Sequence, residues 1–391
     1  MSIQKYLFVG LPILTLPIAT LNAESSNPDV TFFLYDAGET KALEPVIEYL
    51  KNHNKVVDIL AVGTASTLIK DQSSVIDLEK DCGITTKITP ELWKRNQQLN
   101  TEELKKLKNC TRAPLLVSGY NSAVQNQLLE TLKPTKTTTA VFYDSFNPPH
   151  CTLSDKSECY AEKAAELSDI LIASTYELRD QFQKLSPARC FAFGNPTLES
   201  WRIEMNKTDK KILTETLKIT NEKPVILYIG GYGDDYEDSF GLFLTAVRDL
   251  KNYQILVTLH PKMNGQFEQK LLETMNLSHV RIAGKDLPTP TLASLATVVV
   301  TQRSTAGVQA RFAGLPVIYL DVHPEKYTNF LIDAHLVGQV SSPEAFIDEL
   351  AVINNQSPTN ESLAKKLGIP QNSTEKIGEY LISLTRENPS S

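Results

Sequence analysis

The segment from Thr301 to Pro316 combines the side chains best suited to holding a phosphorylated ligand. Ser304 and Thr305 lie where a turn of small residues leads into a short helical pattern. The first N–H groups of a helix attract anions, and hydroxyls at that point can donate to phosphate oxygens. Arg303 precedes them directly and could pair with a diphosphate. These residues predict a phosphate-binding turn, and the alternative is a capped core helix without a ligand.

Two earlier segments in the same half of the chain also suit an anionic ligand. Gly230, Gly231 and Gly233 follow an apolar run and would let the backbone approach a ligand closely. Their spacing is neither GxGxxG nor a P-loop, so a plain strand-to-helix turn is the alternative. His260 and Lys262 follow the next apolar run, where an imidazole and an ammonium suit a phosphate or a developing negative charge. A lone histidine is, however, more often structural.

Carboxylates follow two apolar runs in the first half of the chain. Asp36 and Glu39 lie in a turn in which Gly38 allows a tight bend before the start of a helix. This turn could contact an acceptor or a phosphate, or it could be an ordinary turn with a capping residue. Asp144 follows the run from Thr139 to Tyr143 in the same way.

Each of these segments follows a short apolar run that predicts a strand, and amphipathic runs between them predict helices. Strands are predicted at residues 30–35, 56–62, 114–117, 139–143 and 170–174 and, after a polar stretch, at residues 224–229, 255–259, 280–282, 298–301 and 316–320. This alternation predicts parallel sheets covered by helices on both faces, with ligands beyond the carboxyl ends of the strands. We therefore expect an α/β protein of two Rossmann-like, doubly wound domains that face a cleft, one over residues 24–203 and one over residues 204–391.

The overall composition is that of a globular protein. The chain has 391 residues, a net charge of -7 and 41% hydrophobic residues. An acidic chain offers no general attraction to nucleic acid or to an anionic membrane surface. These two classes of partner are therefore not expected.

The N-terminal segment predicts export. Lys5 precedes an apolar stretch from Leu7 to Leu21, and the small residue Ala23 is followed by polar residues. This order is typical of a cleaved signal peptide. We expect residues 1–23 to be removed and the mature protein to be periplasmic or secreted, without a membrane span. The alternatives are an uncleaved anchor or an unusual cytosolic N-terminus.

The cysteines favour the same compartment. The chain has five of them, at Cys82, Cys110, Cys151, Cys159 and Cys190. Bridges between Cys151 and Cys159 and between Cys82 and Cys110 are both open, and the odd number leaves one thiol over. No CxxC pair occurs and no histidine lies at ligand spacing from the cysteines, so we expect no metal site.

The block from Arg303 to Pro316 resembles a segment of many GT-B enzymes, Ser-Gly-Thr-Ala-Thr-Leu-Glu-Ala-Leu-Leu-Ala-Gly-x-Pro, in its spacing and its final Gly-x-Pro. These relatives include lipid A disaccharide synthase, the UDP-N-acetylglucosamine 2-epimerases and the capsule and teichoic-acid polymer transferases. His260-Pro261 is similar to a step in the C-terminal domain of the polymer transferases. Gly194-Asn195-Pro196 is similar to the step that ends their N-terminal domain.

The resemblance implies a GT-B fold with a nucleoside-diphosphate donor held mainly by the C-terminal domain, without a further cofactor. Ser304 and Thr305 would then lie at the diphosphate. The glutamate that often contacts the ribose in these families falls on Gln309, whose amide is only a neutral acceptor. The proton of the acceptor would pass to an N-terminal carboxylate, for which Asp36 is the first choice and Asp144 the second.

The function that the resemblance implies is transfer of a sugar or glycerophosphoryl group from such a donor to a glycan, lipid or protein. His260 is a further catalytic candidate. The epimerase segment Thr-Asp-Ser-Gly-Gly is matched by residues 301–305, but its acidic residue falls on Gln302. Epimerase chemistry is therefore the weaker alternative. A second alternative is an exported carbohydrate- or partner-binding protein on a degenerate GT-B scaffold, and a third is a transferase delivered into a host cell that holds nucleotide sugars.

Overall fold

The computed structural model describes residues 27–69, 73–87, 94–149, 159–220, 222–233, 235–261, 263–284, 286–353 and 360–387. The predicted signal peptide, Cys151 and Lys262 lie outside these residues. Within the described ranges, no helix combines the length and the apolar character that crossing a membrane would require.

The first sheet has six parallel strands. They are β1 (Val30–Leu34), β2 (Val57–Ala61), β3 (Leu115–Ser118), β4 (Thr138–Tyr143), β5 (Ile170–Ala173) and β6 (Arg189–Ala192), in the spatial order β2-β1-β3-β4-β5-β6. The accompanying helices are α1 (Ala37–Asn52), α2 (Ala65–Leu68), α3 (Thr101–Cys110), α4 (Ala123–Leu132), α5 (Tyr160–Leu167) and α6 (Tyr176–Leu185). Every residue of β1, β2, β3 and β5 is buried, as expected for strands with helices on both faces.

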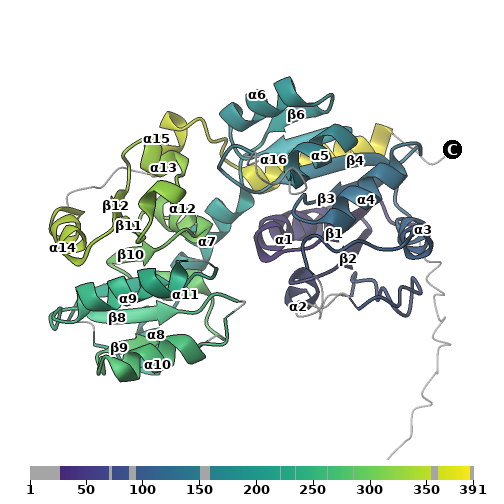
Figure 1. Ribbon diagram of the computed structural model, residues 1–391. Coiled ribbons are helices and arrows are strands. Elements are labelled where there is room, and N and C mark those ends of the chain that lie inside the picture. Colours follow the sequence, from purple (N-terminus) through teal and green to yellow (C-terminus); the bar gives the residue numbers. More distant parts are fainter. Residues whose placement is uncertain are drawn as a thin grey trace, which may run out of the picture.

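The second sheet also has six parallel strands. They are β7 (Val225–Ile229), β8 (Gln254–Thr258), β9 (Val280–Ile282), β10 (Val298–Thr301), β11 (Val317–Leu320) and β12 (Gly338–Val340), in the order β12-β11-β10-β7-β8-β9. The helices that follow β6 in the chain are α7 (Pro196–Lys207), α8 (Lys210–Leu217), α9 (Tyr236–Val247), α10 (Gln266–Thr274), α11 (Thr289–Ala293), α12 (Thr305–Phe312), α13 (Phe330–Asp333), α14 (Pro343–Val352), α15 (Asn360–Lys366) and α16 (Ser373–Glu387), with a 3-10 turn at Pro324–Lys326. Figure 1 shows the two sheets in separate lobes.

The two doubly wound sheets confirm the predicted fold class. Strand order reverses between β1 and β3 in one sheet and between β7 and β10 in the other, and ligands of open α/β sheets bind at such switch points. The ten predicted strands are present with ends that shift by one or two residues. Strands β6 and β12 were not located from the sequence because they are short and carry polar residues such as Arg189 and Gln339.

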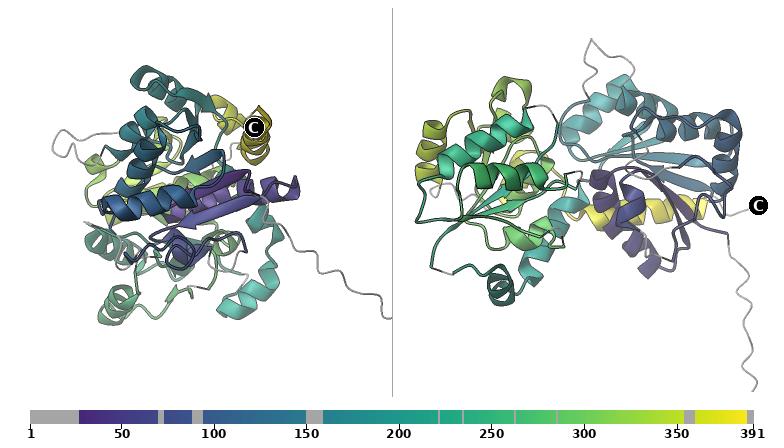
Figure 2. Two further views of the ribbon diagram at one scale, coloured as in Figure 1. Left: turned by 90° about the vertical axis from the view of Figure 1, so that its right-hand side faces the viewer. Right: turned by 60° about the horizontal axis from the view of Figure 1, so that its bottom comes forward.

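Helix α16 returns to the first lobe. It packs against α1, and its buried residues Ile377, Leu381 and Leu384 belong to the same apolar cluster as β1 and α1. Both views in Figure 2 place this yellow helix beside the purple N-terminal elements. At the start of α16, the backbone N–H of Ser373 donates to Glu199 of α7 at 2.6 Å. Residues 373–387 thus pack on the first sheet although they follow the second sheet in the chain, and the predicted division at residues 203 and 204 stays a prediction.

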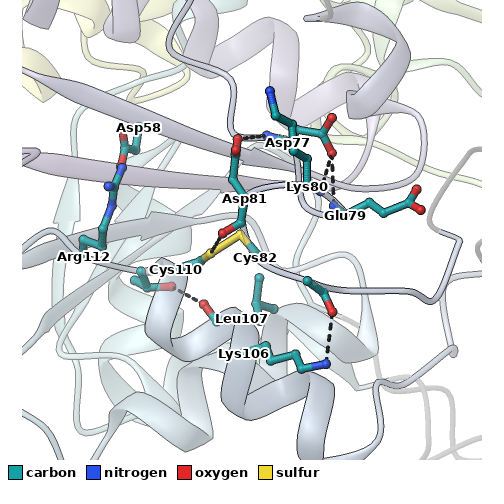
Figure 3. Close-up of a disulfide and its surroundings, with 12 residues drawn as sticks. Asp58, Asp77, Glu79, Lys80, Asp81, Cys82, Lys106, Leu107, Cys110 and Arg112 are labelled. Atoms are coloured by element: carbon teal, nitrogen blue, oxygen red, sulfur yellow. Dashed lines mark hydrogen bonds and ion pairs between the residues drawn. A yellow bond between two sulfur atoms is a disulfide. The ribbon is translucent and has the colours of Figure 1, made fainter. Parts of the chain in front are cut away.

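A disulfide joins Cys82 to Cys110 at the end of α3, and this is one of the two predicted pairings. Figure 3 shows this bond between a loop that follows β2 and the last residue of α3. Cys159 is also disulfide-bonded, and its predicted partner Cys151 lies outside the described residues. Cys190 is a buried free thiol whose pKa burial raises to about 11.

Removal of the Cys82–Cys110 bond is expected to lower the free energy of unfolding by about 3 kcal/mol, because it closes a chain loop and so restricts the unfolded state. The two cysteines are separated by 28 positions in the sequence. Urea unfolding of the double variant Cys82→Ala/Cys110→Ala against the oxidised wild type would measure this loss. The variant has no Cys82–Cys110 bond for a reducing agent to break, so a reducing agent should not lower its stability by this route. A loss well below 1 kcal/mol would show that the bond does not constrain the chain.

Candidate functional site

A cleft of about 500 Å³ lies between the carboxyl ends of the two sheets. It is lined by Asp36, Ala37, Gly38, Thr64, Tyr120, Asn121, Asp144, Ser145, Gly231, Tyr232, His260, Pro261, Gln302, Arg303, Ser304 and Thr305. A cavity of similar size, about 550 Å³, lies at the amino ends of β4 to β6 and includes Lys136 and Arg189. Volume alone therefore does not identify the site. The cleft is the stronger candidate because both sheets contribute to it at their switch points.

Asp36 and Glu39 form a capping box at the start of α1. Asp36 Oδ1 accepts from the backbone N–H of Glu39 at 3.0 Å, and the Glu39 carboxylate accepts from the backbone N–H groups of Tyr35 and Asp36. Glu39 is fully buried and also accepts from Gln125 Nε2 at 2.8 Å. A Cβ at position 119 would overlap Glu39 Oε2, so Gly119 leaves the room that this carboxyl occupies.

Burial raises the pKa of the Glu39 carboxyl well above its usual value, and the neighbouring charge of Asp36 raises it further. Glu39 lies behind the wall of the cleft and is not among the described residues that line it. Asp36 and Asp144 are the carboxyls among the described residues that line the cleft.

Asp144 follows β4 and faces α1. A Cβ at Gly38 would collide with Asp144 Oδ2, so the glycine in the Asp36 turn makes space for this second carboxyl. Burial raises the pKa of Asp144 to about 7, the charge of Asp36 raises it too, and a hydrogen bond from Tyr120 lowers it in part. The backbone carbonyl of Asp144 accepts from Asn195 Nδ2 at 2.8 Å. A carboxyl that titrates near pH 7 can accept a proton at the pH at which most proteins work.

The N-terminus of α12 forms the opposite wall. Ser304 is its N-cap, and its Oγ accepts from the backbone N–H of Ala306 at 3.1 Å, which leaves the hydroxyl proton free to donate. Thr305 is exposed beside it. Tyr319 Oη donates to the backbone carbonyl of Ser304 at 3.3 Å, and Gly307 provides the space that this tyrosine needs. The predicted phosphate-binding turn thus lies across the cleft from the carboxyls.

Arg303 lines the cleft but its charge is already paired. Its guanidinium donates to Asp321, with Nη2 at 3.0 Å from Oδ1, and Nη2 lies 3.1 Å from Asp235 Oδ2. Asp235 also pairs with Lys326 Nζ at 3.0 Å. Arg303 is the only lysine or arginine among the described residues that line the cleft. Its predicted contact with a diphosphate therefore stays a prediction, and two carboxylates would compete with that ligand.

The glycine segment after β7 serves packing as well as access. Gly230 donates to the backbone carbonyl of Thr258 at 3.0 Å, and a Cβ there would lie 2.5 Å from the same oxygen. Gly231 lines the cleft, whereas Gly230 and Gly233 do not. Gly233 has a φ of 90°, in the left-handed region that favours glycine.

Several side chains in the cleft were not singled out from the sequence, among them Tyr232 and Gln302. Tyr232 is 51% exposed, and its ring centroid lies 4.3 Å from that of His260. Gln302 is 2% exposed, and its Nε2 has no hydrogen-bond partner among the described residues. Gln302 directly follows β10, and Tyr232 lies three residues beyond β7, so both belong to the strand-end segments that could have marked them. Gln302 is a buried donor that a ligand acceptor in the cleft could satisfy.

Two further predicted site residues are not seen in the cleft lining that the described part of the chain forms. Gln309 lies in α12 and is not among the described residues that line the cleft, so its expected contact with a ribose stays a prediction. Lys262 lies outside the described residues. The structure brings together Asp36, Asp144, Gly231, His260, Arg303, Ser304 and Thr305.

Comparison of the whole chain with solved structures identifies its fold. No protein-family model matches the chain, and no curated protein sequence matches it. The UDP-GlcNAc 2-epimerase from Neisseria meningitidis, solved with UDP-GlcNAc, matches with a TM-score of 0.64 at 15% identity, over 90% of this chain and 99% of that chain. The epimerase from Methanocaldococcus jannaschii, in complex with UDP-GlcNAc and UDP, matches with a TM-score of 0.60 at 12% identity, over 90% and 99%.

The wall teichoic acid polymerase TagF matches with a TM-score of 0.60 at 12% identity, over 93% of this chain and 90% of that chain. These alignments cover both sheets, but identities this low carry the fold and not the reaction. The chain therefore has the GT-B fold that these epimerases and this polymerase share.

Proposed function

We propose that the protein transfers a group from a nucleoside-diphosphate donor to a hydroxyl of an acceptor, without a metal ion. The observation that supports this proposal is that two different kinds of groups line opposite sides of one cleft. The N-terminus of α12, with the hydroxyls of Ser304 and Thr305, faces the carboxyls of Asp36 and Asp144. The first wall suits a diphosphate, and the second suits the proton of an attacking hydroxyl.

In the proposed reaction, the acceptor oxygen attacks the donor atom that is bonded to the diphosphate. Asp144 takes the proton of the acceptor hydroxyl, and its pKa of about 7 makes a useful fraction of it ionised at neutral pH. The bond to the diphosphate breaks, and its electron pair stays on the phosphate oxygen. The N–H groups at the start of α12 and the hydroxyls of Ser304 and Thr305 stabilise that charge.

The compared structures support a nucleotide as the ligand. Two of them were solved with UDP-GlcNAc, and one of these also with UDP. The cleft of about 500 Å³ lies within the range of small-ligand sites. We extend this ligand class to the present chain as part of the proposal.

A thermal-shift screen of residues 24–391 against UDP, CDP, GDP and their sugar conjugates tests this proposal. A ligand at 100 times its dissociation constant adds about 2.7 kcal/mol to the free energy of unfolding. We expect one nucleotide to raise the melting temperature. Ser304→Ala should weaken the binding of that nucleotide roughly tenfold, because a charge-assisted hydrogen bond is lost. Lys207→Ala, at the exposed end of α7, is the control. A flat response to every nucleotide would refute the proposal, and conversion of a UDP-sugar to its epimer without an acceptor would replace transfer with epimerisation.

A second candidate function is the binding of an uncharged glycan without catalysis. The specific observation in its favour is Arg303, whose guanidinium is paired with Asp235 and Asp321 and so is not free for a diphosphate. Glycan-array binding that does not depend on added nucleotide would favour this function. Binding that requires a nucleotide would favour transfer.

We also propose that the protein is exported. Disulfides persist in oxidising compartments, and Cys82–Cys110 is such a bond. Fractionation of the producing cells and N-terminal sequencing would test this, with Glu24 expected as the first residue. A cytoplasmic protein that begins at Met1 would contradict it.

A further inference from the structure

The loop that follows Asp144 inserts an aromatic side chain into the other domain. Phe146 is 4% exposed and belongs to the apolar cluster formed by β7, β10, α12 and their neighbours. Its ring centroid lies 5.3 Å from that of Phe330 in α13. Phe330 in turn lies 6.3 Å from Phe312, the last residue of α12. A side chain from the first lobe is therefore packed as a core residue of the second.

This packing links the two walls of the cleft. Helix α12 presents Ser304 and Thr305 to the cleft at its N-terminus and Phe312 to the aromatic cluster at its other end. The same cluster holds Phe146, two residues beyond Asp144. The position of Asp144 relative to the start of α12 thus depends on a contact between domains and not only on its own sheet.

Contacts within the first lobe hold the other side of the loop that follows Asp144. Asn195, in the segment between β6 and α7, donates from Nδ2 to the backbone carbonyl of Asp144 at 2.8 Å and to Ser174 Oγ at 3.5 Å. Tyr143 Oη donates to the backbone carbonyl of Asn147 at 2.7 Å, which closes the loop on itself. Asp144 is therefore held on one side by Asn195, which also caps α7, and on the other by Phe146.

We propose that Phe146 is a positioning residue, which holds Asp144 at the distance from the start of α12 that proton transfer requires. The proposal rests on the proposed transfer reaction. Opening of the cleft would pull Phe146 out of the cluster and expose its ring to water, so burial of this ring favours the closed arrangement roughly 10- to 100-fold. A shift of a reacting group by about 1 Å can cost roughly 100-fold in rate. The interdomain contact therefore acts on the chemical step rather than on donor binding.

The experiment compares Phe146→Ala with Phe346→Ala. Phe346 is also fully buried, but it belongs to the apolar cluster on the other face of the second sheet. For Phe146→Ala we expect kcat to fall roughly 10- to 100-fold, with a change of less than about threefold in the dissociation constant of the donor nucleotide. The acid limb of the pH profile should move to lower pH, because Asp144 loses part of the burial that raises its pKa. Phe346→Ala should lose stability without this shift, and Phe146→Leu should recover most of the rate.

Hydrogen exchange of the backbone amides of residues 143–147 gives a readout that does not need turnover. We expect faster exchange in Phe146→Ala than in the wild type and no change in Phe346→Ala. Equal kcat, pH profile and exchange in the two alanine variants would overturn the positioning role. If Phe146→Ala does not fold, Phe146→Leu is compared with the wild type instead. A small loss of rate with a shift of the acid limb to lower pH supports the positioning role, and a wild-type rate, pH profile and exchange overturn it. A wild type that neither binds nucleotide nor turns over would refute the proposed reaction, while exchange in this loop would still measure the contact.

Discussion

Replacement of Asp144 by Asn is expected to lower kcat roughly 10²- to 10⁴-fold, which is the usual contribution of a positioned general base. Asparagine keeps the shape of the side chain and its acceptor oxygen for Tyr120, but it cannot take a proton. The affinity for the donor nucleotide should change little, because Asp144 lies on the wall opposite α12. Steady-state kinetics with nucleotide binding measured separately would distinguish the two effects.

The pH dependence makes this prediction specific to Asp144. The base must be ionised, so wild-type kcat should rise with pH through about 7, which is the pKa of Asp144. Asp36→Asn is the matched control. It removes a negative charge that raises the pKa of Asp144, so the acid limb should move to lower pH while most of the rate remains. Equal activity of wild type and Asp144→Asn, with a loss confined to Asp36→Asn, would make Asp36 the base.

The same carboxyl should also affect stability. The pKa of Asp144 is raised from 3.8 to about 7 in the folded protein, so the folded state holds a proton that the unfolded chain releases. The free energy of unfolding therefore falls as pH rises through this window. Asp144→Asn does not titrate, so at pH 8 the variant should be the more stable protein, by on the order of 4 kcal/mol. Urea unfolding of both proteins at pH 4 and pH 8 would check the sign.

Leu381→Ala is expected to lower the free energy of unfolding by about 2–5 kcal/mol, as for other buried leucines that leave a cavity. Leu381 is fully buried in the cluster that contains β1 and α1, although about 350 positions separate it from β1. The cavity would therefore open in the first domain. Chemical denaturation measures the loss, and hydrogen exchange in β1 and β3 would locate it.

Lys376→Ala is the control for this prediction. It lies in the same helix, is exposed, and should change stability by less than about 0.5 kcal/mol. Equal losses in the two variants would mean that α16 contributes helix propensity rather than packing. No loss in either would mean that the helix does not stay docked on α1 in solution.

The cleft side chains could be predicted because parallel strands end at one edge of a sheet. Asp36, Asp144, His260 and Ser304 each follow a strand that is recognisable as an apolar run, so their meeting requires only the fold. The pairing of Arg303 could not be predicted in this way. Its partners Asp235 and Asp321 lie 68 and 18 positions away, and the contact depends on how β7, β10 and β11 align.

The burial of individual side chains could not be predicted from the sequence either. Glu39 has the pattern of an ordinary capping residue, and only the packing of Gly119 and Gln125 around it makes it a buried carboxyl with a raised pKa. Phe146 has no local signal at all, because its contacts come from the other domain. Helix α16 has an amphipathic pattern that predicts a helix but does not indicate which sheet it covers.

The return of α16 to the first lobe ties the folding of both ends of the chain together. While the protein is being made, β1 to β6 can all be present and yet lack the surface that Ile377, Leu381 and Leu384 supply. Until residue 387 has been made, the apolar side of α1 has no cover from α16, and exposed surface of this kind is what chaperones and proteases recognise. A chain that stops before Ser373 would keep that exposure permanently. The apolar surface of the first domain is therefore complete only in a molecule that includes α16.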